Sequence, residues 1–339
     1  MSVSSFVTEH GNGWLRIKVP LPFSLKWVNA YLLPSDGGWT LIDPGLRSAD
    51  AEACWQELLP QLGIGFRDIA AIVLTHHHPD HYGLAGWFQE RTGAPVYMSE
   101  SAHRAALRMW GEGETFSEEL VAAFLAFGLP GERVAAMRGH LAGVLSQVLP
   151  HPEDVRTIVP GEALPVEMAG TNWLAIGGEG HAPGHVSFYD PRGRRMLCGD
   201  QVLPDITPNI GWLPGGDPDP LKSYIESLER LSAYDTVMAF PGHRDPFADV
   251  SGRIESTIRH HDRRLQAMYG IIAEQGPMTP FDVCERVFGA RLSGNAHQLR
   301  FGLAETIAHL VRLEETGRLV RIFSETPGEG CPVIRFGVP

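Results

Sequence analysis

Short runs rich in aromatic, β-branched and other apolar residues fill much of the first third of the chain, which is the pattern of β-strands. The runs Trp14 to Val19, Trp27 to Leu33 and Trp39 to Asp43 are separated by Pro and Gly turns, as expected for hairpins. A helical period follows from about Ala49 to Leu59. A continuous apolar run from Ile69 to Leu74 then predicts a strand buried on both faces. These elements predict a sheet covered by helices.

The middle of the chain is predicted to hold a helical insertion and a second set of strands. Between about Ser99 and Pro150 the apolar residues recur at helical spacing. Strand-like runs then return at Thr157 to Ile158, Trp173 to Ile176, Val186 to Tyr189, Arg195 to Cys198 and Thr236 to Ala239. We expect a catalytic domain of about residues 1–250, with its core ending near Phe247 and the insertion at about 99–150.

Residues 251–339 follow a different order of elements. Three helices are predicted, at about Arg253 to Gln275, from Pro280 to about Phe288, and across Leu299 to Leu313. Thr279 stands where an N-cap residue is expected before a proline in the first turn. Two strand-like runs end the chain, Arg318 to Phe323 and Val333 to Phe336, with a Pro-Gly turn between them. Three helices and a hairpin are the order of a winged-helix domain.

Composition narrows the class of protein. Hydrophobic residues make up 43% and charged residues 20%, which is ordinary globular usage. The net charge of −12 repels phosphate backbones at long range and argues against a nucleic-acid partner. The 4 cysteines are scattered, as in a protein with reduced thiols. No apolar run approaches the roughly 18 residues of a membrane helix, so we expect a cytoplasmic protein without a membrane partner.

The sharpest chemical signal is the run His76 to His81, directly after the buried strand. In an extended chain alternate side chains face the same way, so His76 and His78 are expected to close on one metal ion. Asp80 and His81, past Pro79, are expected to reach a second ion. His77 points the opposite way and is not expected to bind metal.

This run resembles the motif of the metallo-β-lactamase superfamily, a His-x-His-x-Asp-His sequence after a strand. The family also has a histidine in a Pro-Gly-His turn, an aspartate at a later strand end and a last histidine before the core closes. This sequence offers Pro183-Gly184-His185, Gly199-Asp200 and Pro241-Gly242-His243. Asn29, Tyr31 and Asp43-Pro44-Gly45 are similar to the opening hairpins of the family. The resemblance spans about residues 14–247 and implies an α/β fold, a four-layer αββα sandwich.

The resemblance implies a binuclear metal site. His76, His78 and His185 would hold the first divalent ion, Asp80, His81 and His243 the second, and Asp200 would bridge both. Such a pair makes a hydroxide nucleophile at neutral pH, and Asp80 would position it as the catalytic residue. Zinc suits this mixture of imidazole and carboxylate ligands, and iron and manganese accept the same set.

Other polar residues near the motifs are expected to play supporting parts. His181, four residues before His185, is predicted to support a turn or orient a ligand, and Asp43 is predicted to have a structural part. The pair His260-His261 is expected at a helix surface or a contact between domains.

The resemblance narrows the chemistry further. An aspartate at position 200 is similar to glyoxalase II, lactonases and phosphodiesterases, whereas the best-known zinc β-lactamases have cysteine there. The segments Asp200 to Pro204 and Thr207 to Gly211, with the winged helix, resemble a branch of bacterial hydrolases of mostly unassigned substrate and a mitochondrial endoribonuclease.

Three functions remain open from the sequence. The first is hydrolysis of a small ester, thioester or lactone, under an apolar lid formed by Met109, Trp110, Phe116, Phe124, Phe127 and Met137. The second is cleavage of RNA, although residues 252–339 carry 11 basic and 10 acidic residues and show no basic face. The third is a non-enzymatic winged-helix binding protein, which leaves the seven polar positions without a purpose. The winged helix is expected to stabilise or assemble the enzyme, and a homo-oligomer is left open.

Overall fold

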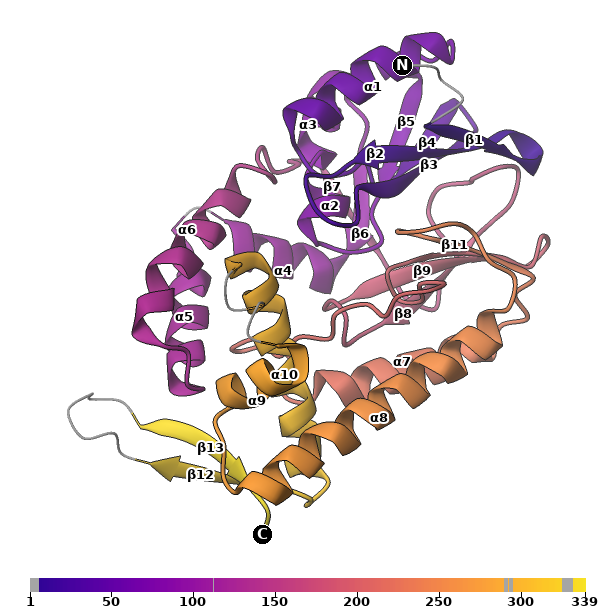
Figure 1. Ribbon diagram of the computed structural model, residues 1–339. Helices are drawn as coiled ribbons and strands as arrows, with labels where there is room; N and C mark the ends of the chain where they lie inside the picture. The colour runs from indigo at the N-terminus through magenta and orange to yellow at the C-terminus, as the bar shows by residue number, and fades with distance from the viewer. Residues whose placement is uncertain (1–5, 112, 290–291, 293–294, 325–331) are drawn as a thin grey trace.

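Two β-sheets lie face to face in a computed structural model of the chain, which describes residues 6–111, 113–289, 292, 295–324 and 332–339 (Figure 1). The first sheet has the order β1 (Val7–His10), β2 (Trp14–Pro20), β3 (Trp27–Ser35), β4 (Gly38–Ile42), β5 (Ile69–Val73), β6 (Val96–Ser99) and β7 (Val155–Ile158). The second has the order β11 (Met238–Pro241), β10 (Arg195–Gly199), β9 (His185–Asp190) and β8 (Leu174–Gly178). The strand runs expected from the sequence are present, with bounds shifted by a few residues.

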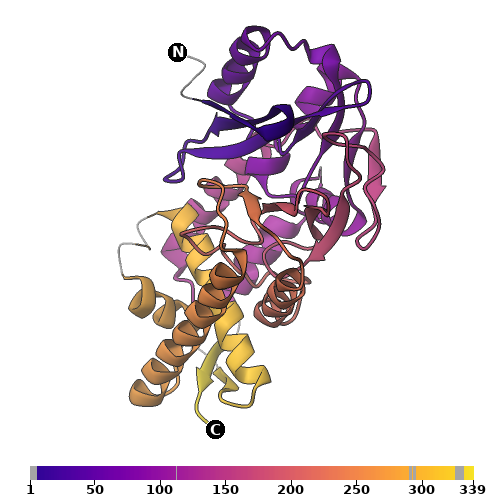
Figure 2. The ribbon, with the colours of Figure 1, turned by 90° about the vertical axis from the view of Figure 1, so that its right-hand side faces the viewer.

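Helices cover the outer face of each sheet. Residues between the sheets form one buried apolar cluster, to which Trp14 and Val73 contribute from the first sheet and Phe188 from the second. Helices α1 (Ala49–Gln61) and α3 (Ala85–Thr92) pack on the first sheet, whereas α7 (Pro220–Ser232) and α8 (Val250–Gln275) pack on the second. The layers are therefore helix, sheet, sheet, helix, as the sequence led us to expect (Figures 1 and 2).

Parallel strands bring several loops to one edge of the sandwich. Strands β4 to β7 are parallel to one another, and β10 is parallel to β11. Because parallel strands end at the same edge, the loops after β4, β5, β10 and β11 meet there. The backbone NH of Val186 donates to the carbonyl of Thr75, and that of Gly242 donates to the carbonyl of Gly199, which ties these loops together.

In the described part of the segment between β6 and β7 lie three α-helices, where the sequence predicted helices. They are α4 (Glu100–Trp110), α5 (Phe116–Ala126) and α6 (Val134–Leu145). The apolar side chains expected to form a lid are instead buried in the main core, with Phe124 and Met137 fully covered. That lid prediction is wrong, because the helical period that suggested it reflects packing of the helices on their neighbours.

The last part of the chain consists of α8, α9 (Pro280–Phe288) and α10 (Ala296–Glu315), followed by the antiparallel strands β12 (Val320–Ser324) and β13 (Val333–Gly337). The order of helices and strands matches the expectation, and Thr279 caps α9 through the NH of Asp282. The Pro-Gly turn of the hairpin and Cys331 lie outside the described residues. Helix α10 lies beside α6 and α7 (Figure 1), and the Asn209 side chain donates to the Glu305 carboxylate of α10.

Several elements were not predicted from the sequence, and α7 is the longest of them. Its signals are plain in retrospect. The Asp219 side chain accepts the NH of Lys222 at the helix start, Pro220 occupies the first turn, and Leu221, Leu228 and Leu231 are buried at helical spacing.

Two smaller observations concern cysteines and membranes. Cys54, Cys198 and Cys284 are free thiols. Among the helices of the described segments, none combines the length and the apolar character needed to span a bilayer.

Candidate metal centre

The loop after β5 places the histidine motif at the edge where the parallel strands end. Strand β5 stops at Val73, His78 has extended backbone angles, and Pro79 begins the one-turn helix α2 (Pro79–Tyr82). Proline suits this position because it lacks the NH that a first-turn residue leaves unpaired. The change from extended chain to helix lets His76 and His78 precede the bend, and Asp80 and His81 follow it.

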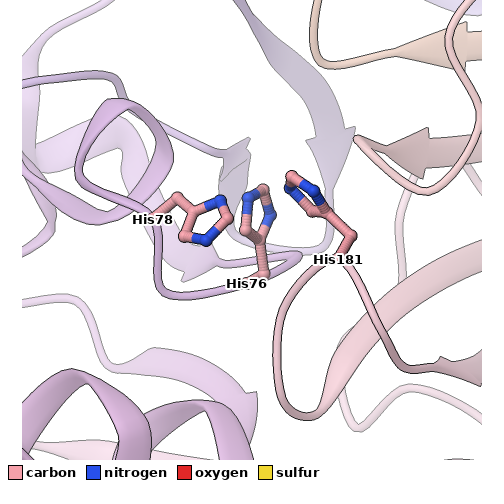
Figure 3. A group of neighbouring side chains, drawn as sticks. All are labelled: His76, His78 and His181. Atoms are coloured by element: carbon pink, nitrogen blue, oxygen red, sulfur yellow. The ribbon is translucent and has the colours of Figure 1, made fainter. Parts of the chain in front are cut away.

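Three imidazoles converge at this edge. His76, His78 and His181 each offer one nitrogen, and these nitrogens lie within 4.8 Å of one another. His76 and His78 come from the loop after β5, and His181 comes from the loop that leads into β9 (Figure 3). Three neutral imidazoles at this spacing form one face of a transition-metal site.

A second group lies next to the first. Asp80, His81 and His243 satisfy the same distance criterion, and so do His76, His81 and Asp200. The Asp200 Oδ2 atom lies 3.5 Å from His81 Nε2 and 3.4 Å from His243 Nε2. The same oxygen lies 3.8 Å from His181 Nε2, so Asp200 stands between the two groups.

The other ring nitrogen of several of these histidines has a partner that fixes the ring. His81 Nδ1 lies 2.9 Å from Asp43 Oδ2, and His181 Nδ1 lies 2.9 Å from the carbonyl of Asn209. His243 Nδ1 lies 3.1 Å from the carbonyl of Trp27. Because a carbonyl or carboxylate oxygen only accepts, each of these Nδ1 atoms carries a proton, and in the neutral ring each Nε2 is left with its lone pair directed into the cluster.

Asp43 supports the cluster from the loop after β4. Its Oδ1 accepts the backbone NH of Thr75 at 2.8 Å, and its Oδ2 accepts the Thr75 hydroxyl at 2.7 Å as well as the His81 ring NH. The Thr75 oxygen lies 2.9 Å from His76 Nδ1. One buried carboxylate therefore orients His81 directly and His76 through Thr75.

Asn29 and Tyr31, noted in the sequence for their similarity to the opening hairpins of the family, hold the turn that carries His243. The Asn29 amide and the Tyr31 hydroxyl both donate to the carbonyl of Pro241, at 3.0 and 2.7 Å. A Cβ atom at Gly242 would lie 2.3 Å from Asp200 Oδ1. Only glycine fits between the turn and the carboxylate, so this turn holds His243 against Asp200.

Protonation in the cluster follows from the opposing effects of burial and charge. Burial lowers the pKa of His76 and of His181, so both rings are neutral at pH 7. Burial also opposes protonation of His243, but the carboxylates of Asp200 and Asp80 outweigh it and raise the pKa of His243 to about 10. The pKa of His81 is raised well above its ordinary value by Asp200, Asp80 and Asp43, again against burial. The carboxylates of Asp80 and Asp200 thus favour a positive charge next to His81 and His243.

The cluster contains buried polar atoms that the protein itself does not satisfy. His76 Nε2, His81 Nε2, His181 Nε2 and Asp200 Oδ1 have no hydrogen-bond partner among the described residues. Buried nitrogen and oxygen atoms are rarely left this way in a folded protein. Imidazole nitrogens and carboxylate oxygens that converge without partners fit divalent transition-metal ions.

Three further histidines noted in the sequence are not among the converging groups of ligand atoms, although the His185 ring stacks on that of His76 with centroids 4.9 Å apart. His185 is buried, and its Nε2 lies 3.3 Å from the backbone NH of Asp200, so this nitrogen already accepts a hydrogen bond. His77 Nε2 lies 3.2 Å from Met109 Sδ, on the far side of the motif. His261, on α8, is buried with its Nδ1 3.1 Å from His309 Nε2 of α10, which places it at a contact between helices.

A cavity of about 930 Å³ opens directly onto the cluster. His78, Asp80, His181, Asp200 and His243 form part of its wall. Most of the rest comes from the turn between β2 and β3, from α6, from the segment after β10 and from α10, with Phe288, Leu292 and Asn295 before α10. Cavities of this size hold small molecules.

Comparison with known proteins agrees with this fold and site. Residues 28–243 match the family described as "Metallo-beta-lactamase superfamily", and residues 265–336 match "Metallo-beta-lactamase-like, C-terminal domain". The chain belongs to the metallo-β-lactamase superfamily.

Individual relatives share nearly the whole chain. It is 30% identical to "Probable metallo-hydrolase YqjP" of Bacillus subtilis, over 88% of this chain and 92% of that protein. The crystal structure of metallo-beta-lactamase family protein TTHA1429 from Thermus thermophilus is 35% identical, covers 96% of this chain and 99% of its own, and superimposes with a TM-score of 0.82. A beta-lactamase domain protein from Burkholderia ambifaria is 29% identical over 98% of this chain and 94% of its own, with a TM-score of 0.84.

Proposed function

We propose that this protein is a binuclear metal-dependent hydrolase of a small ester, thioester or lactone. The observation that carries the proposal is the cavity of about 930 Å³ that ends on the histidine and aspartate cluster. Apolar side chains such as Leu25, Leu203 and Ile206 line it. An apolar wall with a few polar groups at one end suits a small acyl substrate.

The geometry favours a ligand set that differs from the sequence-based one at one position. We assign His76, His78 and His181 to the first ion, in place of the set with His185. His181 Nε2 is unpartnered among the described residues and faces the cluster, whereas His185 Nε2 accepts the NH of Asp200. Asp80, His81 and His243 are assigned to the second ion, and Asp200 to both.

The residues of the chain then have separate tasks in hydrolysis. At such a site the chemistry supplied is acidification of a water molecule and polarisation of the scissile carbonyl oxygen by the divalent ions. Asp80 lies on the cavity wall with its Oδ2 3.1 Å from His243 Nε2. From there the Asp80 carboxylate would orient the attacking water toward the substrate. Asp43 and the carbonyls of Asn209 and Trp27 keep the rings from turning.

The cavity lining favours a small substrate over RNA. An RNA strand needs several phosphate contacts from Lys or Arg. Among the described residues of the wall, Arg300 is the one lysine or arginine. The carboxylate of Asp200 is also the feature in which the site resembles glyoxalase II and lactonases. We interpret the C-terminal helices and hairpin as a winged helix, of which α10 completes the cavity wall.

The test is a substrate panel with metal-loaded protein. Neutral thioesters, esters, lactones and single-stranded RNA are compared at matched salt and metal, for the wild type, for Asp80→Ala and for the control Asp235→Ala, whose side chain is 74% exposed. We expect acyl turnover in the wild type and control, and a loss of about a hundredfold or more in Asp80→Ala. RNA cleavage that Asp80→Ala abolishes, without turnover of any acyl substrate, would replace this proposal by an endoribonuclease.

A further inference from the structure

Arg300 is a buried cation without a partner among the described residues. It lies on α10, its residue is 9% exposed, and it forms no hydrogen bond or ion pair with any residue that the structure describes. Its guanidinium stacks over the ring of Phe301, 4.2 Å from the centroid. Burial lowers the pKa of Arg300 to about 10, so the group remains charged at pH 7. A buried charge of this kind costs free energy unless an anion meets it.

Each carboxylate of the cavity wall already contacts a histidine or arginine other than Arg300. Asp80 and Asp200 face His81 and His243, as described above. Glu305 pairs with Arg264 and accepts the amide of Asn209. None of these carboxylates contributes to the pKa of Arg300, for which burial is the sole cause. Arg300 lines the cavity, and its charge has no carboxylate partner among the described residues.

Two histidines beside Arg300 add unpartnered nitrogens to the same wall. His140 of α6 and His297 of α10 meet edge to face, with ring centroids 5.2 Å apart. His140 Nε2 and His297 Nδ1 are buried without hydrogen-bond partners among the described residues. Burial lowers the pKa of both rings, that of His140 to about 4, so they are neutral at pH 7. A neutral imidazole still donates one hydrogen bond.

An aromatic contact fixes the position of His297. Its ring stacks on Phe23, from the turn between β2 and β3, with centroids 4.8 Å apart and planes at 10°. Phe23, His140, His297 and Arg300 all line the cavity that ends on the metal cluster. Three separate parts of the chain thus build one polar corner in a mostly apolar cavity.

We propose that this corner, with Arg300 at its centre, binds an anionic group of the substrate, a carboxylate or a phosphate, while the scissile acyl bond lies at the metal cluster. The inference rests on the proposed acyl hydrolase function and narrows its substrate class to acyl compounds with a negative charge away from the reacting carbonyl. The planar fork of a guanidinium matches the two oxygens of a carboxylate or phosphate. His140 and His297 supply further donors.

A comparison of three thioesters tests whether a negative charge on the substrate improves hydrolysis and at which end of the substrate it acts. S-acetylpantetheine is neutral, S-acetyl-4′-phosphopantetheine carries a phosphate on the leaving group, and S-glutarylpantetheine carries a carboxylate on the acyl group. We expect the metal-loaded wild type to hydrolyse one of the charged compounds with a kcat/KM at least about tenfold above that of the neutral one. The charged compound with the higher kcat/KM identifies the anionic group and the end of the substrate that carries it.

Substitutions at Arg300 connect this preference to the corner. In Arg300→Gln the ratio of kcat/KM for the charged over the neutral thioester should fall roughly ten- to a hundredfold, mainly through KM. Arg300→Lys keeps the charge and should restore part of the ratio. The control is Arg259→Gln, an exposed arginine of α8 that pairs with Glu255, which should leave the ratio at the wild-type value. Circular dichroism and metal content of each variant show whether a change comes from misfolding.

The outcomes separate this inference from the proposed function. If the wild type hydrolyses the neutral thioester as well as both charged ones, and Arg300→Gln does not change the ratio, the acyl hydrolase stands and the anion corner is wrong. If no thioester, ester or lactone is hydrolysed, the proposed function itself fails. In that case inorganic phosphate and glutarate are titrated calorimetrically into the wild type and Arg300→Gln. Equal affinity for both proteins overturns the anion site, and binding by the wild type alone supports it.

Discussion

The Nδ1 atom of His81 lies 2.9 Å from Oδ2 of Asp43, at the end of a strand that is separated from the histidine motif by a helix and another strand. Asp43 has a φ of +49°, a conformation that non-glycine residues adopt rarely. This conformation is stabilised because both carboxylate oxygens accept hydrogen bonds from Thr75, in the loop after β5. Asp43 therefore positions the cluster without being one of its proposed ligands.

We predict that Asp43→Asn weakens the second metal site. An asparagine has one acceptor oxygen in place of two and presents NH groups at the other position, so it cannot accept all three hydrogen bonds from Thr75 and His81, and the hold on the His81 ring weakens. We expect the affinity for the second ion to fall roughly 10- to 100-fold, measured by competition with a chromogenic chelator. Asp235→Asn, at an exposed position, is the control. An unchanged affinity in Asp43→Asn would show that the contact does not tune the metal site.

Metal content decides between His181 and His185. We predict about two transition-metal ions per chain in the wild type and about one in His181→Gln, because the first ion would lose one of three imidazoles. His185→Gln should keep about two ions, since His185 contacts the backbone of Asp200. Elemental analysis after loading with zinc, manganese or iron measures both. Loss of an ion in His185→Gln but not in His181→Gln would return the assignment to His185, and a wild type below one ion would contradict a binuclear site.

Acid should weaken the contact between α8 and α10 through His261 and His309. Burial lowers the pKa of His261 to about 2 and that of His309 to about 3, so both are neutral in the folded protein. The unfolded chain binds protons at these rings below about pH 6.5, whereas the folded protein does not. The free energy of unfolding should therefore fall as the pH drops below 6.5, by roughly 1.4 kcal/mol per pH unit for each ring.

Urea unfolding at several pH values measures this slope. In His261→Phe one of the two rings no longer titrates, so the decline between pH 6.5 and 5 should be shallower by about one proton. His260→Phe, on the same helix and half buried, should change the slope less. Identical slopes for His261→Phe and the wild type would mean that His261 takes up its proton in the folded state.

Truncation after Phe247 is predicted to give insoluble or inactive protein. Helix α10 is buried over most of its surface, and its residues Leu303, Ile307 and Leu310 share one apolar cluster with the first sheet and its helices. Removing residues 248–339 would expose that cluster and open the cavity wall that Arg300 and Glu305 help to form. Soluble expression, thermal unfolding and activity of the truncated chain test this. A soluble and fully active product would show that the C-terminal part is dispensable.

The sequence alone determined the elements whose signal is local. The apolar run before His76 predicted β5, and the helical period from Ala49 predicted α1, because burial on two faces or on one helical stripe leaves its own spacing. The spacing of His76, His78, Asp80 and His81 likewise predicted two groups of ligands. Alternation in an extended chain and a bend at proline suffice for that.

Tertiary structure decided the contacts that join distant segments. His181 and His185 lie four residues apart in one turn, and their spacing alone sets no direction for either side chain. The direction depends on the carbonyl of Asn209, which holds His181 Nδ1, and on the Asp200 NH, which occupies His185 Nε2. In the sequence Arg300 is one of several basic residues in a nearly neutral segment. The packing of α10 places it in the same cavity as Asp80. Loop side chains and buried charges depend on partners brought by folding, and those partners have no fixed spacing along the chain.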